Sequence, residues 1–198
     1  HAILEYLNGN LTKTTDMSYD SLNRLVSFDD GTVSETYALR GIESVRTSKT
    51  SGGITTTYLL DGARVLAEYE NGTLTRQYIH GTYIDETLAM YKPNQSGLYY
   101  TANGLVSVAS LTDNMGAVAE RYKYAAFGSR TIYALNGTTT RTTSSYSNHI
   151  GFTGRDHDNT GLLFYRWRMT EPNFGKFLER DPIGYSGSKS NLYEYVEG

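Results

Sequence analysis

The chain has 198 residues, and 18 Lys and Arg against 21 Asp and Glu give a net charge of −3. This weakly acidic balance, without a basic cluster, argues against nucleic acid or an anionic membrane as the main partner. Cysteine is absent, which excludes disulfides and thiolate sites, and no apolar run reaches the roughly 18 residues of a membrane span.

Tyrosine recurs along the first two thirds of the chain at intervals close to twenty residues. The 18 Tyr, 20 Gly and three Pro favour strands and tight turns over helices. Between the tyrosines lie paired strand-like runs with turn residues at the tip, the pattern of stacked β-hairpins. The tyrosines in this phase are Tyr19, Tyr37, Tyr58, Tyr78, Tyr100 and Tyr122, separated by 18, 21, 20, 22 and 22 residues.

The first repeat unit contains Tyr19-Asp20-Ser-Leu-Asn23-Arg-Leu-Val26. Asn23 stands at its turn, and asparagine tolerates the left-handed backbone that such a turn needs. We therefore expect two strands joined at this point.

The clearest hairpin is predicted for residues 64–79, around Asn71-Gly72. Asn-Gly is the preferred two-residue type I′ loop, whose twist matches that of paired strands. A regular register puts Tyr69 and Tyr78 on one face and Glu68 with Thr75 on the other. The pairs expected are Glu70 with Thr73, Tyr69 with Leu74, Ala67 with Arg76 and Val65 with Tyr78.

Glycine-containing turns and polar loops divide the rest of the chain. The Ser/Thr-rich residues 138–148 lack apolar anchors apart from Tyr146, so we expect a mobile excursion there. Residues 92–97 form a longer polar loop, and residues 191–196 are expected to make a short terminal turn. The other predicted tips are Asp29-Asp30-Gly31, Ser51-Gly52-Gly53, Asp61-Gly62, Asn103-Gly104, Asn114-Met115-Gly116 and Asn136-Gly137.

Rings and guanidinium groups alternate in Phe164-Tyr-Arg-Trp-Arg168. On a strand, Phe164, Arg166 and Arg168 share one face, and Tyr165 and Trp167 share the other. We expect this strand to pack inside the molecule. The alternative is exposed rings that stack on sugars, with cation–π contacts from arginine.

The sequence favours no metal site. Asp156-His-Asp158 precedes a glycine, as in a calcium loop, but the twelfth position of that loop is Trp167 instead of glutamate. His149 and His157 flank a turn and could lie close together. The four histidines, which also include His1 and His80, show no metal-ligand spacing. No phosphate loop, dinucleotide fingerprint or nucleophile elbow occurs, so no cofactor is expected.

The segment from Gly161 to Gly184 resembles the closing part of the core that ends RHS-repeat (YD-repeat) proteins. Tyr19-Asp20 and the residues after it are similar to the YD repeat, with Asn23 where the family usually has glycine. The resemblance implies an all-β chain of consecutive antiparallel hairpins in a curved, spiralling sheet, with repeats at 1–103 and the RHS-repeat-associated core segment at 104–198. Its other blocks are Leu105–Arg130, Phe152–Asp156, Thr160–Leu162, Arg180–Gly184 and Asn191–Tyr195.

In family members that cleave themselves, an Asp-Pro-x-Gly block supplies one carboxylate of an aspartyl-protease-like pair. The resemblance gives this role to Asp181, with Arg180 tuning or orienting it. The alternative to a catalytic role is a purely structural turn, since Asp, Pro and Gly all suit turn geometry. The chain contains no second block and no downstream peptide to cut, so we expect no enzyme in this chain.

The resemblance implies a structural shell segment that encapsulates or presents an effector or toxin domain. The alternatives are a self-assembling extracellular filament or coat, a cell-surface carbohydrate-binding module, and an incomplete autoproteolytic core. The chain starts at His1 without a leader, so we expect a processed product or a piece of a longer chain. Expected partners are the rest of its polypeptide or identical copies through edge strands, with an effector cargo, and the expected location is secreted or cell surface after bacterial-type export.

Overall fold

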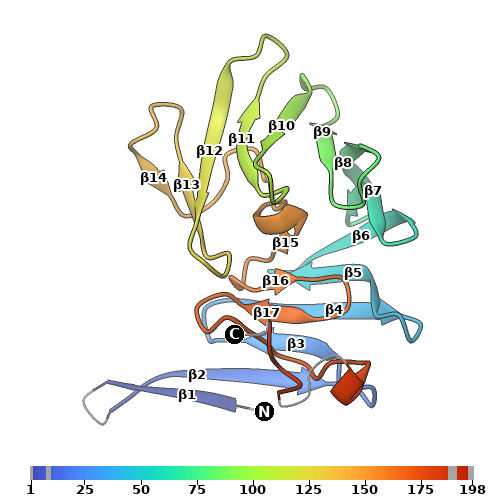
Figure 1. The fold of residues 1–198 in the computed structure, drawn as a ribbon, viewed down its shortest axis with the longest axis vertical. Coiled ribbons are helices and arrows are strands. Elements are labelled where there is room, and N and C mark those ends of the chain that lie inside the picture. The colour runs from blue at the N-terminus through green and yellow to red at the C-terminus, as the bar shows by residue number, and fades with distance from the viewer. Residues whose placement is uncertain (1, 8–9, 187–190, 196–198) are drawn as a thin grey trace.

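The computed structural model describes residues 2–7, 10–186 and 191–195, with side chains from residue 13 onward. A single sheet of fourteen strands forms a curved wall, in which each strand pairs antiparallel with the next in chain order (Figure 1). The all-β fold class is confirmed. The strands of the wall are β1 (Ala2–Leu7), β2 (Asn10–Tyr19), β3 (Leu25–Asp29), β4 (Ser34–Arg40), β5 (Val45–Ser51), β6 (Ile54–Asp61), β7 (Arg64–Glu70), β8 (Thr73–His80), β9 (Thr87–Tyr91), β10 (Leu98–Ala102), β11 (Val108–Thr112), β12 (Val118–Tyr124), β13 (Arg130–Tyr133) and β14 (Thr140–Arg141).

The chain after β14 returns across the wall; we call residues 142–186 and 191–195 the interior segment. It carries a four-stranded sheet in the order β15-β16-β17-β18, whose strands β16 and β17 lie beside the strands near the N-terminal end of the wall (Figure 1). Its elements are the 3₁₀ turns η1 (Phe152–Gly154) and η2 (Gly184–Ser186) and the strands β15 (Asp156–His157), β16 (Leu163–Phe164), β17 (Met169–Glu171) and β18 (Lys176–Phe177). None of the helical turns among the described residues has the length and apolar character to cross a membrane.

The predicted turns join the strands of the wall. Asn23 has φ of 60° and Asn71 has φ of 48°, the left-handed conformation that asparagine tolerates. Near the hairpin ends one strand often carries an extra residue. A β-bulge bends its strand and increases the local twist, so bulges repeated from hairpin to hairpin curve the wall. These extra residues include Val26, Thr47, Leu66, Thr75, Leu88 and Ala109.

One such bulge corrects the predicted register of β7 and β8. Glu70 pairs with Thr73 and Tyr69 with Leu74 as expected, but Glu68 then pairs with Arg76 because Thr75 is bulged. The expected pairs of Ala67 with Arg76 and of Val65 with Tyr78 are therefore wrong. A shift of one residue exchanges the faces of a strand, and it brings Glu68 to the same side as Tyr78.

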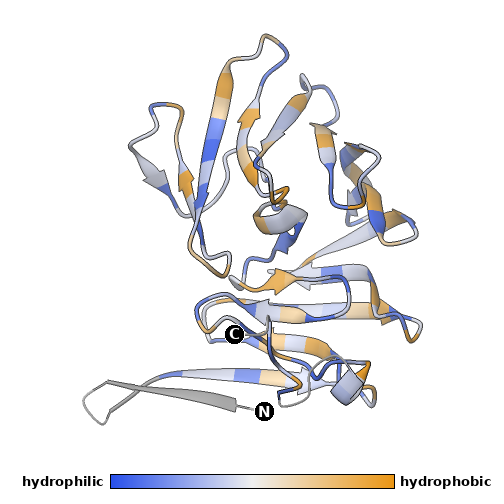
Figure 2. Ribbon diagram, in the orientation of Figure 1, coloured by the Kyte–Doolittle hydropathy of each residue, from blue (hydrophilic) through white to orange (hydrophobic). Residues whose placement is uncertain are grey.

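We call the side of the wall that contacts the interior segment its inner face. Hydrophobic and hydrophilic residues are interspersed along the strands (Figure 2), and successive residues of a strand face opposite sides of the sheet. Two apolar clusters fill the space between wall and interior segment. One centres on Leu111 and includes Ile150 from the interior segment; the other joins Leu25 and Phe28 of β3 to Leu162.

The structure corrects two expectations for the end of the wall and the interior segment. Residues 138–143 are exposed, as expected for a loop, but the end of the predicted excursion at 138–148 is attached to the wall, because Asn148 is buried and Ser144 donates a 2.5 Å hydrogen bond to buried Glu120. The run from Phe164 to Arg168 is not one strand. β16 ends at Phe164 and the chain turns, with the Trp167 amide donating to the Tyr165 carbonyl at 2.6 Å. The predicted faces of this run therefore do not exist.

The expected terminal turn at 191–196 is partly described. The Glu194 amide donates to the Asn191 carbonyl at 3.3 Å, and Val196 lies outside the described residues.

Candidate functional site: the ionic seam between wall and interior segment

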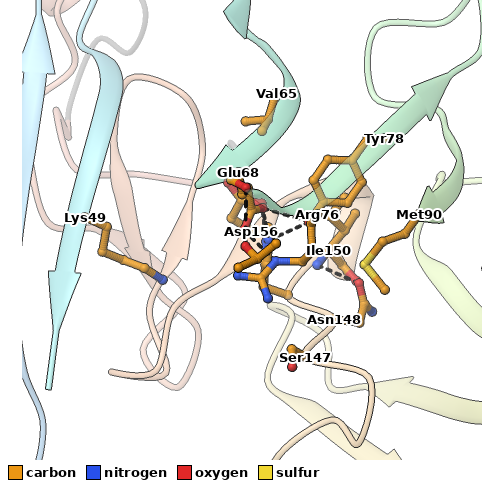
Figure 3. Close-up of polar contacts among 12 residues, drawn as sticks. Lys49, Val65, Glu68, Arg76, Tyr78, Met90, Ser147, Asn148, Ile150 and Asp156 are labelled. Carbon is orange, nitrogen blue, oxygen red and sulfur yellow. Dashed lines mark hydrogen bonds and ion pairs between the residues drawn. The ribbon is translucent and has the colours of Figure 1, made fainter. Parts of the chain in front are cut away.

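Charged side chains meet where the interior segment crosses the inner face, and Glu68 of β7 lies at their centre (Figure 3). We call this group the ionic seam; its residues are Arg46, Lys49, Glu68, Arg76, His149, Asp156 and Asp158. Its carboxylate accepts hydrogen bonds from Arg76 Nε at 2.6 Å and from the Tyr78 hydroxyl at 2.7 Å. It also contacts Nε2 of His149, which comes from the interior segment. The bulge at Thr75 creates this group, because it turns Glu68 and Arg76 to the inner face together.

His149 bridges two carboxylates. Its Nδ1 lies 2.8 Å from Asp156 of β15, on the side opposite Glu68. Burial alone would lower the pKa of His149, but the negative charges of Glu68 and Asp156 raise it to about 9. Burial would raise the pKa of Glu68, but His149 and Arg76 hold it at about 2. At neutral pH the group is therefore a buried set of full charges, with an imidazolium between two carboxylates.

Arg46 of β5 extends the seam. Its side chain is 3% exposed and lies 2.6 Å from Asp158 and 3.2 Å from Asp156. Its guanidinium also stacks over the Phe164 ring, 4.2 Å from the centroid, and Lys49 Nζ contacts Asp158 at 2.8 Å. Desolvation costs cancel much of the attraction in such buried pairs. The seam therefore fixes where the interior segment sits more than it adds net stability.

A second acid anchors the start of the interior segment. Buried Glu120 of β12 accepts hydrogen bonds from the Tyr122 hydroxyl at 2.5 Å and from the Ser145 amide at 3.0 Å. Glu35 repeats the motif on β4, where the Tyr37 hydroxyl donates to it at 3.0 Å. A glutamate two residues before a repeat tyrosine was the sequence signal for these buried acids, and sequence reasoning missed it.

Glu179 joins the far end of the interior segment to β3. One carboxylate oxygen accepts from the Leu25 amide at 3.1 Å, and the other accepts from the Met169 amide at 2.7 Å. Burial raises the pKa of Glu179 to about 7, although both amides and Arg168 lower it. This acid is therefore poised to change charge near neutral pH.

The predicted pair Arg180 and Asp181 lies in a turn after this acid. Asp181 accepts from the Ile183 amide at 3.0 Å and lies 3.1 Å from Arg168 Nη2. Arg180 is exposed and donates to the Tyr193 hydroxyl at 3.2 Å. The structure therefore places Arg168, which sequence reasoning had not connected to this motif, beside the carboxylate.

Three of the residues considered for metal binding, Asp156, Asp158 and His157, face a cation or a backbone amide. Asp156 and Asp158 pair with Arg46, and His157 Nε2 accepts from the Phe152 amide at 3.1 Å. Burial, followed by the charge of Arg130, lowers the pKa of His157 to about 3, so this ring is neutral. Within the described part of the chain, His, Asp and Glu form no group suited to a metal ion.

The structure is therefore a curved wall of consecutive hairpins, with a segment of the same chain bound to its inner face through the ionic seam.

No family model matches the chain. It is 29% identical over 159 residues, 77% of its length, to the tRNA3(Ser)-specific nuclease WapA of Bacillus spizizenii. Over 43% of its length it is 35% identical to double-stranded DNA deaminase toxin A of Burkholderia cenocepacia, and over 56% it is 25% identical to toxin subunit YenC1 of Yersinia entomophaga. The chain spans 6%, 6% and 13% of these relatives.

Among solved structures, TcdB2-TccC3 matches with a TM-score of 0.69 over 92% of this chain and 10% of that chain, at 20% identity. This likeness shows the fold. With the sequence relatives, it supports the RHS-repeat type of toxin protein as the family that this chain resembles.

The expectation that the chain is not an enzyme is contradicted. Its relatives are named as tRNA nucleases and as a deaminase toxin, so the chain is related in sequence to enzymes.

Proposed function

We propose that the chain is part of the wall and sealing core of an RHS-repeat toxin protein. In this proposal residues 1–103 are repeat hairpins and residues 104–198 are the RHS-repeat-associated core segment. The wall encloses or presents an effector domain that belongs to the same polypeptide. The protein is exported by its bacterium to the cell surface or the medium.

The observation that carries this proposal is the attachment of the interior segment to the inner face. Arg46 and Glu68 of the wall contact Asp158 and His149 of the segment, and Glu179 of the segment accepts from the Leu25 amide of the wall, each at a different place. Serial pairing leaves unpaired backbone only at the first and last strands of a sheet, so such a wall lengthens by adding hairpins. The toxin names of the relatives support the effector as cargo.

The test uses the natural polypeptide with its effector region, treated with a nonspecific protease. We expect the effector region to be protected in the wild type. It should be digested faster in Arg46→Ala, which leaves Asp158 buried without its guanidinium, and remain protected in the matched control Arg121→Gln, at an exposed position of β12. Digestion of the wild-type effector region as fast as in the isolated effector domain would refute encapsulation.

A second candidate is strand addition between copies of the chain. Among the described residues β1 pairs only with β2, and an open strand edge can accept another strand. Sedimentation of the 198-residue chain over a range of concentrations tests this. Association that rises with concentration supports it, whereas a monomer at every concentration contradicts it.

Autoproteolysis through Asp181 is a third candidate, supported by a partly buried carboxylate held by Arg168 and the Ile183 amide. The measurement is cleavage of a longer chain that continues beyond Gly198. Asp181→Asn should abolish cleavage while Asp113→Asn, at the turn between β11 and β12, should not. Unchanged cleavage in Asp181→Asn would remove the candidate.

A further inference from the structure

A cavity of about 80 Å³ opens between the inner face of β5–β9 and the interior segment. An apolar cavity of about 150 Å³ holds benzene, so this smaller space suits a group about the size of acetate or propionate. Apolar side chains form part of the lining of the cavity, among them Val45, Leu60, Ile84 and Phe164.

Positive charge exceeds negative charge around this cavity. Arg155 binds Asp85 with both Nη atoms, at 2.8 and 2.9 Å, and Arg166 contacts the same carboxylate. Arg64 also lines the cavity, and its guanidinium donates to the Thr82 carbonyl at 3.3 Å. Three guanidinium groups, of Arg64, Arg155 and Arg166, therefore line this part of the cavity together with one aspartate, Asp85. The other cations of the lining are compensated by carboxylates, because Arg46 contacts Asp156 and Asp158 and His149 contacts Asp156 and Glu68.

Two more features point to a ligand. The Nε of Arg155 is buried and has no acceptor within the part of the chain that the structure describes. Arg166 has φ of 61°, a left-handed conformation that is unusual for arginine and that concentrates at binding sites. This turn carries Trp167, which also lines the cavity and is 53% exposed.

We propose that this cavity binds a carboxylate group on a short apolar stem. The guanidinium groups of Arg64 and Arg166 bind the carboxylate, because their planar forks match its two oxygens. The apolar residues and the Trp167 indole contact the stem. The carboxylate comes either from a free short-chain acid or from a polypeptide, as an acidic side chain or a C-terminal carboxylate. The apolar lining disfavours inorganic phosphate, which is strongly hydrated.

Trp167 is the only tryptophan of the chain, so its fluorescence reports on this place alone. The experiment titrates the 198-residue chain with propionate at constant ionic strength, with chloride and inorganic phosphate as comparison anions. We expect a saturable change with propionate and a much weaker one with the other two. A short peptide with a free C-terminal carboxylate, compared with its amidated form, shows whether a polypeptide also supplies the group.

Arg166→Gly removes the guanidinium and suits the positive φ, and Arg64→Gln removes the second cation without touching the turn. Each should weaken propionate binding about tenfold, the usual scale for one charge-assisted hydrogen bond, while Arg121→Gln should bind as the wild type does. Circular dichroism shows whether each variant is folded. If Arg166→Gly does not fold, the affinity of Arg64→Gln for propionate tests the proposal. No saturable response in the wild type, an equal response to phosphate, or unchanged affinity in a folded Arg166→Gly or Arg64→Gln variant would overturn the proposal.

Discussion

Protonation of Glu179 should change the stability of the fold near neutral pH. Glu179 is 4% exposed, and its carboxylate bridges the amides of Leu25 and Met169. Burial raises its pKa from 4.5 to about 7, so the folded chain retains a proton that the unfolded chain releases. Between these two values, unfolding releases that proton, and stability falls as the pH rises.

The size of the effect follows from the shift. One pKa unit corresponds to 1.36 kcal/mol, so the Glu179 contribution is fully present below about pH 4.5 and has lost about 3 kcal/mol above about pH 7. Glu179→Gln carries no titratable group at this position. The free energy of unfolding of the wild type, relative to that of Glu179→Gln, should therefore fall by about 3 kcal/mol across this window.

Urea denaturation followed by circular dichroism, at a series of pH values, measures this difference. Glu43→Gln serves as the control, because Glu43 is exposed on the turn between β4 and β5, and its curve should parallel that of the wild type. If the pH dependence of Glu179→Gln equals that of the wild type, the carboxylate does not titrate in the folded chain as the burial argument requires.

Three further predictions concern the seam and the core. His149 has a pKa raised from 6.5 to about 9, so it should contribute about 3 kcal/mol below pH 6.5 that is lost as the pH rises through 9; His149→Gln should lack this alkaline loss in the same urea series. Arg46→Ala should destabilise the fold by about 3–5 kcal/mol because it leaves Asp158 buried and weakly compensated, and a cost below about 1 kcal/mol would contradict a buried pair. Leu111→Ala, at a side chain with 0% exposure, should cost about 2–5 kcal/mol in thermal or urea unfolding, whereas Leu135→Ala, at 65% exposure, should cost less than about 0.5 kcal/mol.

Local sequence predicted the strands and turns of the wall but not the bulges along its strands. Asn71-Gly72 and Asn23 mark turns because their backbone preferences are intrinsic to the residues, and the structure has those turns. The bulge at Thr75 was missed since an inserted residue needs no special side chain and leaves the apolar pattern almost unchanged. Its consequence was large, because it moved Glu68 to the inner face.

The seam was beyond prediction for a different reason. Arg46 and Asp158 are separated by 112 positions, and the sequence around either residue gives no indication that the other is its partner. The Arg180-Asp181 motif was found from its neighbours in sequence, but its cation, Arg168, is supplied by the turn that interrupts the expected strand. Local propensity specifies turns and strands, whereas burial in three dimensions selects the charge partners.

The last part of the chain binds the inner side of the wall at a fixed place, and chemical cross-linking measures this attachment. The chain has no cysteine, and Asn159 Nδ2 lies 3.3 Å from Ser51 Oγ although the two residues are 108 positions apart. With a short bismaleimide, the Ser51→Cys and Asn159→Cys double variant should form an intramolecular cross-link in high yield. The pair Asn159→Cys and Met115→Cys, the latter at the distant turn between β11 and β12 (Figure 1), should not. Equal yields from the two pairs, or none from the first, would contradict the account.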